Sequence, residues 1–381
     1  MKNLLFFVAI FTFAGCNNEQ NEYKYSLIPS NEIVFKLNYE SSNAPAPYSD
    51  FKTEDTVLLA VWNNRNRSVE IYNLNLCRLV NEIQIPSEGP GSFPNVVDII
   101  FKSRDSIILI STTKEAALID RSGTIQKQLS FKYDHNGEPI HSADYHLSFT
   151  NYLVGEDLFL CQEYRVAGAE LPSTEFFNST YINCIVNFNY QVCTQNNLTY
   201  PQMLQGRDLT GTDILRVYNE NGEHIYHFSP LKSLFITSDH ETFKEVPLVT
   251  SYQLELPEEN WEKLKQGFTA YYTYYAEHDQ IVRFLYDEYR KQYHIAVRIK
   301  KKLLESDLGA APMRWKYPHC LLITLNSDFK VIAETLLPDQ VYSCMFMFVT
   351  PDGLYISEDH PNNPDFDEDF MRFRLFKLEK I

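Results

Sequence analysis

The densest group of candidate metal ligands lies near the C-terminus, where Asp365, Asp367 and Asp369 alternate with Phe and Glu. Carboxylate oxygens are hard ligands of the kind that Ca²⁺ prefers. The stretch lacks the glycine and the spacing of a helix-loop-helix calcium loop. We therefore expect a solvated acidic loop, with these three aspartates as candidates for a calcium site, and we expect no other cofactor.

An aromatic run from Phe268 to Tyr275 is the second group with a chemical use. Its composition predicts a strand, in which alternate residues point to opposite sides. Tyr combines an apolar ring with a polar tip, which suits stacking on a sugar or lining a channel. Packing between neighbouring sheets is the alternative interpretation. The candidate contact residues are Trp261, Tyr271, Tyr272, Tyr274, Tyr275 and Trp315.

Recognisable catalytic motifs are absent from the sequence. It has ten histidines but no His-Glu-x-x-His or Cys-x-x-Cys pair, so zinc has no support. A Gly-x-Ser-x-Gly elbow is also absent. We therefore assign no catalytic residue.

The N-terminus has the pattern of an export signal. Lys2 precedes an almost unbroken apolar run from Leu4 to Phe13, which is too short to span a membrane. Phe13-Ala14-Gly15-Cys16 resembles the bacterial lipobox, which implies that Cys16 carries acyl chains such as palmitate. An ordinary signal peptide with a chance Cys is the alternative.

These features predict a signal peptide over residues 1–15, a lipidated polar tether over 16–26 and one folded domain over 27–381. Asn17 follows the Cys, and in lipobox proteins this pattern implies the outer membrane. The face of that membrane, periplasmic or exterior, is left open.

Six further cysteines follow Cys16: Cys77, Cys161, Cys184, Cys193, Cys320 and Cys344. An even number in an exported chain permits disulfides, with fifteen ways to pair all six. Cys184 and Cys193, nine residues apart across a predicted hairpin, are the first pair to test. Several of these residues lie in apolar strand patterns, so buried free thiols are the alternative.

The composition excludes several classes of protein. The 381 residues include 44% hydrophobic residues, enough to bury a large core, which excludes a disordered chain. The formal charge of −16 argues against a nucleic-acid partner, because a phosphate-binding surface needs clustered Lys and Arg.

A repeat of polar turn and short apolar strand runs through the rest of the chain. Repeats of about 40–50 residues with several strands each are typical of propeller blades. We predict an all-β propeller of six four-stranded blades, or seven if the stretch between 281 and 354 contains another. The first apolar residues of the six units are Val57, Ile107, Leu158, Ile225, Ile281 and Leu354.

The last unit is one strand short, and the chain stops at Ile381. Glu32 to Leu37 is an extended segment without a unit of its own, so we expect it to pair with Phe370 to Leu378 and complete the last blade. Short helices are predicted over 257–266 and 300–308, in connections between strands.

The lipobox, the strand repeats, the Tyr and Phe content and the segment Ser87-Glu88-Gly89-Pro90-Gly91-Ser92-Phe93 together resemble the six-bladed β-propeller lipoproteins of Bacteroidetes. The resemblance implies a propeller fold and a place in the cell envelope. Most members of that group have no assigned activity, so it implies no catalytic residues.

We therefore expect a membrane-anchored, non-enzymatic binding or scaffolding module, with a glycan or an envelope protein as partner. The alternative is a metal-dependent hydrolase or lyase whose carboxylates converge on a central channel.

Overall fold

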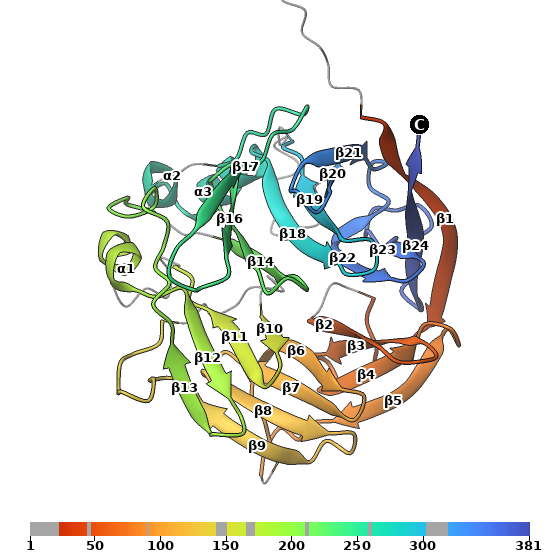
Figure 1. Ribbon diagram of the computed structural model, residues 1–381. Coiled ribbons are helices and arrows are strands. Elements are labelled where there is room, and N and C mark those ends of the chain that lie inside the picture. The colour runs from red at the N-terminus through yellow and green to blue at the C-terminus, as the bar shows by residue number, and fades with distance from the viewer. Residues whose placement is uncertain are drawn as a thin grey trace, which may run out of the picture.

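The structure is a computed structural model that describes residues 23–43, 47–89, 91–141, 151–164, 172–209, 213–257, 261–301 and 319–381. The strands of these residues form six four-stranded antiparallel sheets arranged radially around one axis (Figure 1). The predicted all-β, six-bladed propeller is therefore confirmed.

Within each blade the strands follow one another from the axis to the rim. Blade 1 contains β2 (Tyr48–Lys52), β3 (Val57–Asn63), β4 (Ser68–Asn73) and β5 (Arg78–Gln84). Blade 2 contains β6 (Val96–Ser103), β7 (Ser106–Ser111), β8 (Glu115–Asp120) and β9 (Ile125–Ser130). Blade 3 contains β10 (Tyr152–Val154), β11 (Asp157–Cys161), β12 (Asn183–Asn187) and β13 (Val192–Gln195).

Blade 4 contains β14 (Ile214–Tyr218), β15 (His224–Phe228), β16 (Ser233–Thr237) and β17 (Lys244–Pro247). Blade 5 contains β18 (Gln280–Asp287), β19 (Gln292–Arg298), β20 (Cys320–Leu325) and β21 (Val331–Leu336). Blade 6 contains β22 (Ser343–Thr350), β23 (Gly353–Ser357), β24 (Phe370–Lys380) and β1 (Tyr25–Lys36).

The first strand of the chain closes the ring. β1 pairs antiparallel with β24, from Tyr25 opposite Lys380 to Lys36 opposite Phe370, so the predicted pairing is confirmed (Figure 1). The strand begins at Tyr25, two residues inside the predicted tether.

Five of the six predicted repeat units coincide with the second strand of a blade. The fifth unit was placed wrongly, because Ile281 lies in the innermost strand β18 and the second strand is β19. In the other units the polar turn lies between two strands. Here Asp279 lies between the helix that ends at Ala276 and the innermost strand β18, so the same pattern marks a helix-to-strand junction.

Three short helices lie in connections between strands: α1 (Ser173–Ser179), α2 (Trp261–Lys265) and α3 (Phe268–Ala276). α2 confirms the helix predicted over 257–266, whereas most of 300–308 lies outside the described residues. Among the residues that the structure describes, no helix has the length and apolar character needed to cross a membrane.

The strand predicted over Phe268 to Tyr275 is wrong, because this run forms α3. Gly267, with φ 105°, separates α3 from α2. The rings of Tyr271 and Tyr275 lie one helical turn apart with centroids separated by 4.6 Å, a side-chain pair that stabilises a helix. Local context therefore overrides the strand preference of Tyr.

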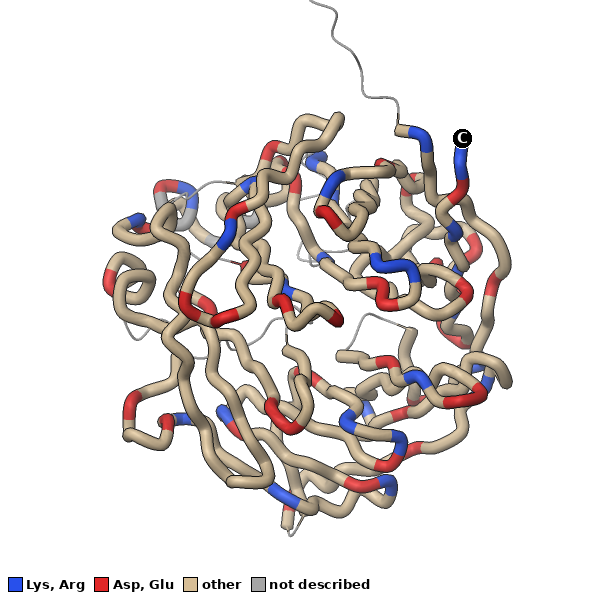
Figure 2. Tube along the Cα trace, viewed as in Figure 1, with Lys and Arg blue, Asp and Glu red and all other residues tan. Residues whose placement is uncertain are grey.

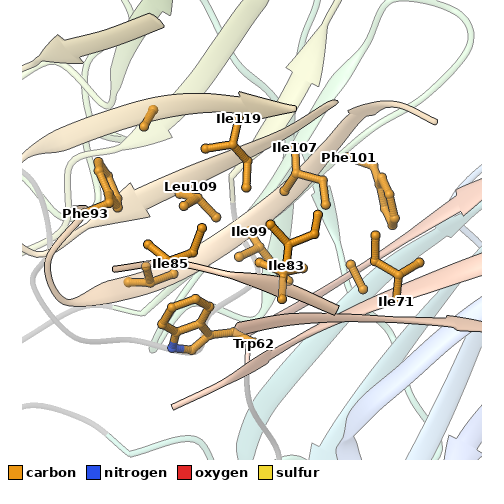
Figure 3. Packing of buried hydrophobic residues seen from close by; sticks show 14 of the residues in the cluster. Trp62, Ile71, Ile83, Ile85, Phe93, Ile99, Phe101, Ile107, Leu109 and Ile119 are labelled. Atoms are coloured by element: carbon orange, nitrogen blue, oxygen red, sulfur yellow. The ribbon is translucent and has the colours of Figure 1, made fainter. Parts of the chain in front are cut away.

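The core consists of apolar layers between neighbouring blades. Between blades 1 and 2, Trp62 and Ile83 face Ile99 and Ile107 (Figure 3). Phe93, which ends the Gly-Pro-Gly-x-Phe motif, is fully buried in the same layer. The motif therefore anchors the connection between the two blades.

The connections divide between the two ends of the axis. Strands in a blade alternate in direction, so the first-to-second and third-to-fourth connections lie on one face. None of these exceeds the six residues of 238–243, and we call this the short-turn face. Connections between the second and third strands, and between blades, lie on the opposite, long-loop face, which carries α1, α2 and α3.

The short turns repeat one hydrogen bond. A side-chain oxygen of Asn or Asp accepts a hydrogen bond from the backbone N–H two residues later, which fixes the turn. The residues that accept these bonds include Asn73 (from the N–H three residues later), Asp120, Asn187, Asn219, Asp287 and Asn326.

Replacing Phe35 of β1 by alanine should lower the free energy of unfolding by about 3–5 kcal/mol, because it empties space between blades 6 and 1. Phe35 is fully buried there, with its ring centroid 5.2 Å from that of Tyr72. Urea denaturation measures the loss. Val34→Ala is the matched control, since Val34 is 38% exposed on the other side of β1. Equal losses in both variants would contradict this account of the closure.

Candidate functional site on the propeller axis

Polar side chains gather along, or directly before, the innermost strands of blades 1, 2, 3 and 5. Tyr48 and Asp50 lie in β2, Asp98 is the third residue of β6 and Arg283 is the fourth residue of β18. Asn151 directly precedes β10. We call these five residues the axial cluster. Because innermost strands start at the long-loop face, Tyr48, Asp98 and Asn151 lie in or before the half of their strands nearer that face, whereas Asp50 and Arg283 lie near the middle of theirs.

Irregular pairing directly precedes two of the charged residues. In β18 the pairing with β19 shifts between Ile281 and Arg283, and in β6 the pairing with β7 shifts between Val96 and Asp98. Each shift leaves one residue without a partner opposite. A bulge of this kind bends a strand and redirects the next side chain, and bulges are frequent beside functional sites.

Tyr48 connects the cluster to blade 6. Its hydroxyl donates to the carbonyl of Met347 and accepts from the N–H of the same residue, the latter at 2.9 Å. The Arg283 guanidinium carbon lies 5.2 Å from the centroid of the Tyr48 ring, a cation–π distance. Burial raises the pKa of Tyr48 to about 12, so its hydroxyl stays protonated.

Asp98 is buried, and both of its carboxylate oxygens accept hydrogen bonds. One accepts from Asn151 Nδ2 at 2.9 Å and the other from the N–H of Ile99 at 2.9 Å. Burial raises the pKa of Asp98 to about 6, against the opposing effects of these hydrogen bonds and of the Arg283 charge.

Asp50 titrates in the same range. Burial raises its pKa to about 6, and the Arg283 charge opposes that rise. The residue is nevertheless exposed to solvent. Both observations fit a carboxyl group that water reaches at the axis while the surrounding innermost strands displace most of the bulk solvent.

The cluster therefore combines two carboxyl groups, one guanidinium, one amide and one phenol. Above about pH 6 both carboxyls are ionised and, with Arg283, the cluster carries one net negative charge. Carboxylates, amides and guanidinium groups bind hydroxyl-rich ligands through hydrogen bonds, and carboxyls that titrate near neutrality can also transfer protons.

The aromatic candidates lie on the long-loop face, in the connection that leads into β18. In α3 the Tyr274 ring contacts both Tyr275 and His278, with centroids 5.6 and 4.2 Å apart. Tyr272 also lies in α3 and Trp261 in α2, whereas Trp315 and Cys16 lie outside the described residues. Their role in binding stays a prediction.

The predicted acidic loop follows β23. Asp365, Asp367 and Asp369 are exposed there, and Asp367 accepts a hydrogen bond from the N–H of Asp369 at 3.0 Å. Within the described residues, no group of three or more His, Cys, Asp or Glu side chains is arranged to hold a metal ion. Calcium binding by this loop stays a prediction.

A second buried charge lies between blades 3 and 4. Arg216 of β14 donates to Asn183 Oδ1 and, at 2.6 Å, to the carbonyl of Phe159. Its guanidinium carbon lies 4.7 Å from the centroid of the Tyr152 ring. Because these contacts join the second and third strands of blade 3 to the innermost strand of blade 4, we interpret Arg216 as a structural connection between blades.

The comparisons with known proteins place the chain in a family. The model of a domain of unknown function, DUF4221, matches residues 24–336. The chain belongs to the DUF4221 family. A crystal structure of a DUF4221 member from Bacteroides vulgatus has a TM-score of 0.81 and 20% identity, covering 94% of this chain and 99% of that chain. The expected six-bladed propeller family of unknown function is thus confirmed.

Two other solved structures are far less similar to this DUF4221 chain. Hsv2 of Kluyveromyces lactis has a TM-score of 0.40 and 13% identity, covering 82% of this chain and 70% of that chain. The β-propeller domain of Cps50 (Swd1) from Myceliophteria thermophila has a TM-score of 0.43 and 9% identity, covering 92% of this chain and 99% of that chain. No curated protein matches the chain.

The two raised carboxyl pKa values make stability depend on pH. Both exceed the value of about 3.9 for a free aspartate, so between these values the folded protein holds protons that the unfolded chain has released. The stability that Asp50 and Asp98 contribute is complete below about pH 4 and is lost as pH rises through about 6.

Replacing Arg283 by glutamine should raise both carboxyl pKa values further, because it removes the positive charge that favours their ionised forms. A carboxyl ¹³C NMR titration of aspartate-labelled protein measures the shift. Arg104→Gln is the control, since Arg104 is exposed in a short turn between β6 and β7. Unchanged pKa values in the Arg283 variant would show that its charge does not act on the axial cluster.

Proposed function

We propose that this DUF4221 protein is a lipid-anchored, non-enzymatic binding module of the outer membrane. In this proposal its short-turn face lies nearest the membrane. The axial cluster then binds a hydroxyl-rich ligand such as a saccharide. The observation that carries the proposal concerns strand direction. β1 begins at the short-turn face, whereas the innermost strands that carry the axial cluster begin at the long-loop face.

The direction of β1 supports this orientation. As the fourth strand of blade 6, β1 begins at the short-turn face, where the N–H of Ile381 donates to the carbonyl of Lys24 at 3.0 Å. The chain from Cys16 to Lys24 spans at most about 29 Å when fully extended. A lipid on Cys16 would therefore keep the short-turn face close to the membrane and leave the long-loop face accessible.

The side chains of the axial cluster support a saccharide as ligand. Asp50 is exposed and can accept hydrogen bonds from ligand hydroxyls. The tyrosines of α3 lie on the same long-loop face and could supply stacking surfaces. Along the described part of the chain, acidic and basic residues are interspersed around the ring, unlike the clustered Lys and Arg that a nucleic acid would need (Figure 2).

A second candidate function is a hydrolase or lyase. The observation that favours it is the pair of carboxyl groups with pKa values of about 6, which suits general acid–base catalysis. Incubation of a bound saccharide with the protein separates the two functions. Recovery of the intact saccharide supports a binding module, whereas product formation that Asp50→Asn abolishes supports the enzyme.

Metabolic labelling with a fatty-acid analogue tests the anchor. The wild type should be labelled and should sediment with the outer membrane, because acyl chains bury many methylene groups in the bilayer. Cys16→Ala should be unlabelled, while Cys77→Ala, which removes an exposed thiol, should behave as the wild type. Equal labelling of the two variants would exclude lipidation at Cys16.

A glycan array followed by calorimetric titration tests the ligand. Arg283→Gln should weaken binding of any saccharide that the wild type binds by at least about tenfold, the loss of one hydrogen bond to a charged group. Arg104→Gln, on the short-turn face, should bind as the wild type. Binding that is the same in all three proteins would place the saccharide site elsewhere, and a silent array would contradict a saccharide ligand.

A further inference from the structure

Cys184 and Cys193 face each other inside blade 3. They lie in the neighbouring strands β12 and β13, where Cys184 pairs with Gln195 and Val186 pairs with Cys193. The two cysteines are therefore diagonal neighbours on one side of the sheet. Their sulfur atoms lie 2.8 Å apart, and both residues are buried.

Cys320 and Cys344 form a second buried pair. Cys320 starts β20 in blade 5, and Cys344 is the second residue of β22 in blade 6. Both belong to the apolar layer between these blades, and their thiols lie close enough for each to shift the pKa of the other. This contact joins two blades directly beside the ring closure, since Leu27 of β1 lies in the same layer.

The two remaining cysteines of the folded domain have different surroundings. Cys77 is exposed in a turn on the short-turn face, where its thiol contacts the carbonyl of Leu74 at 3.3 Å. Cys161 is buried in β11, and burial raises its pKa to about 12, which suppresses the reactive thiolate.

We propose that the exported protein carries two disulfides, Cys184–Cys193 and Cys320–Cys344, and that Cys77 and Cys161 stay reduced. The proposal rests on export, which is part of the proposed function, but not on the lipid or on the ligand. Of the possible pairings among the six cysteines, the side-chain contacts select these two bonds.

The oxidant belongs to the class of exported proteins that carry a reactive disulfide. A cysteine thiolate attacks that disulfide and forms a mixed disulfide, and the thiolate of the partner cysteine then displaces the oxidant. Each bond removes two electrons and two protons from the chain and reduces the oxidant to a dithiol.

A sulfur–sulfur contact becomes a disulfide when the two atoms approach to bonding distance and the flanking strands adjust. A disulfide has a sulfur–sulfur distance of about 2.0 Å, and the Cys184 and Cys193 sulfur atoms already lie in contact on adjacent strands. Because all four residues are buried in the finished propeller, oxidation would occur during folding after export. Once formed, the buried bonds would resist reductants that do not unfold the protein.

Trapping of thiols in intact cells tests the proposal. The full-length protein is quenched in acid, unfolded and alkylated without reductant, and then digested for mass spectrometry. We expect two linked peptide pairs, 184 with 193 and 320 with 344, and alkylation of Cys77 and Cys161. In Cys184→Ser, Cys193 should become alkylated while the 320–344 link persists; Cys77→Ser should leave both links unchanged.

Alkylation of all six cysteines without prior reduction would overturn the proposal, as would links between other pairs. The same cells can be labelled with a fatty-acid analogue, so failure of the disulfide proposal can be distinguished from failure of the lipid-anchor proposal. A lipidated protein with free thiols refutes the disulfides alone. Absent lipid labelling with both disulfides present refutes the anchor alone.

Discussion

The pairing of β1 with β24 is the constraint on which the rest of the structure depends. A ring of sheets without it would expose the edge of β24, whose unpaired backbone groups invite association with other chains. The pairing runs along β1 from Tyr25 to Lys36 and inserts Phe35 into the layer between blades 6 and 1. It also fixes where the N-terminus leaves the propeller, and so the orientation that a lipid on Cys16 would impose.

The same closure holds one side of the axial cluster. Tyr48 of blade 1 bonds to both backbone groups of Met347 in blade 6, across the layer that Phe35 completes. The Arg283 guanidinium packs on the ring of Tyr48. The cluster thus depends on contacts between residues that are far apart in the sequence, and loosening of blade 6 should disturb the position of Arg283.

The fold was predictable from the sequence because its signals are local. Several short turns use an Asn or Asp whose side chain bonds to the backbone two or three residues later, so the turns recur visibly along the chain, as at Asp120. The strand predicted over α3 was wrong because the run forms a helix, in which Tyr271 and Tyr275 pair one turn apart, and the residue preferences of Tyr and Phe do not reveal this. The axial cluster was missed because Asp98 and Arg283 come from different blades and are positioned by bulges, which leave no motif.

Hydrogen–deuterium exchange of β24 tests the closure most directly. If β1 seals the ring, the β24 amides that face β1 should open only with global unfolding and should be as protected as those that face β23. Rapid exchange of the amides that face β1, while those facing β23 stay protected, would show that the ring is open in solution. The orientation and the axial site derived from it would then have to be abandoned.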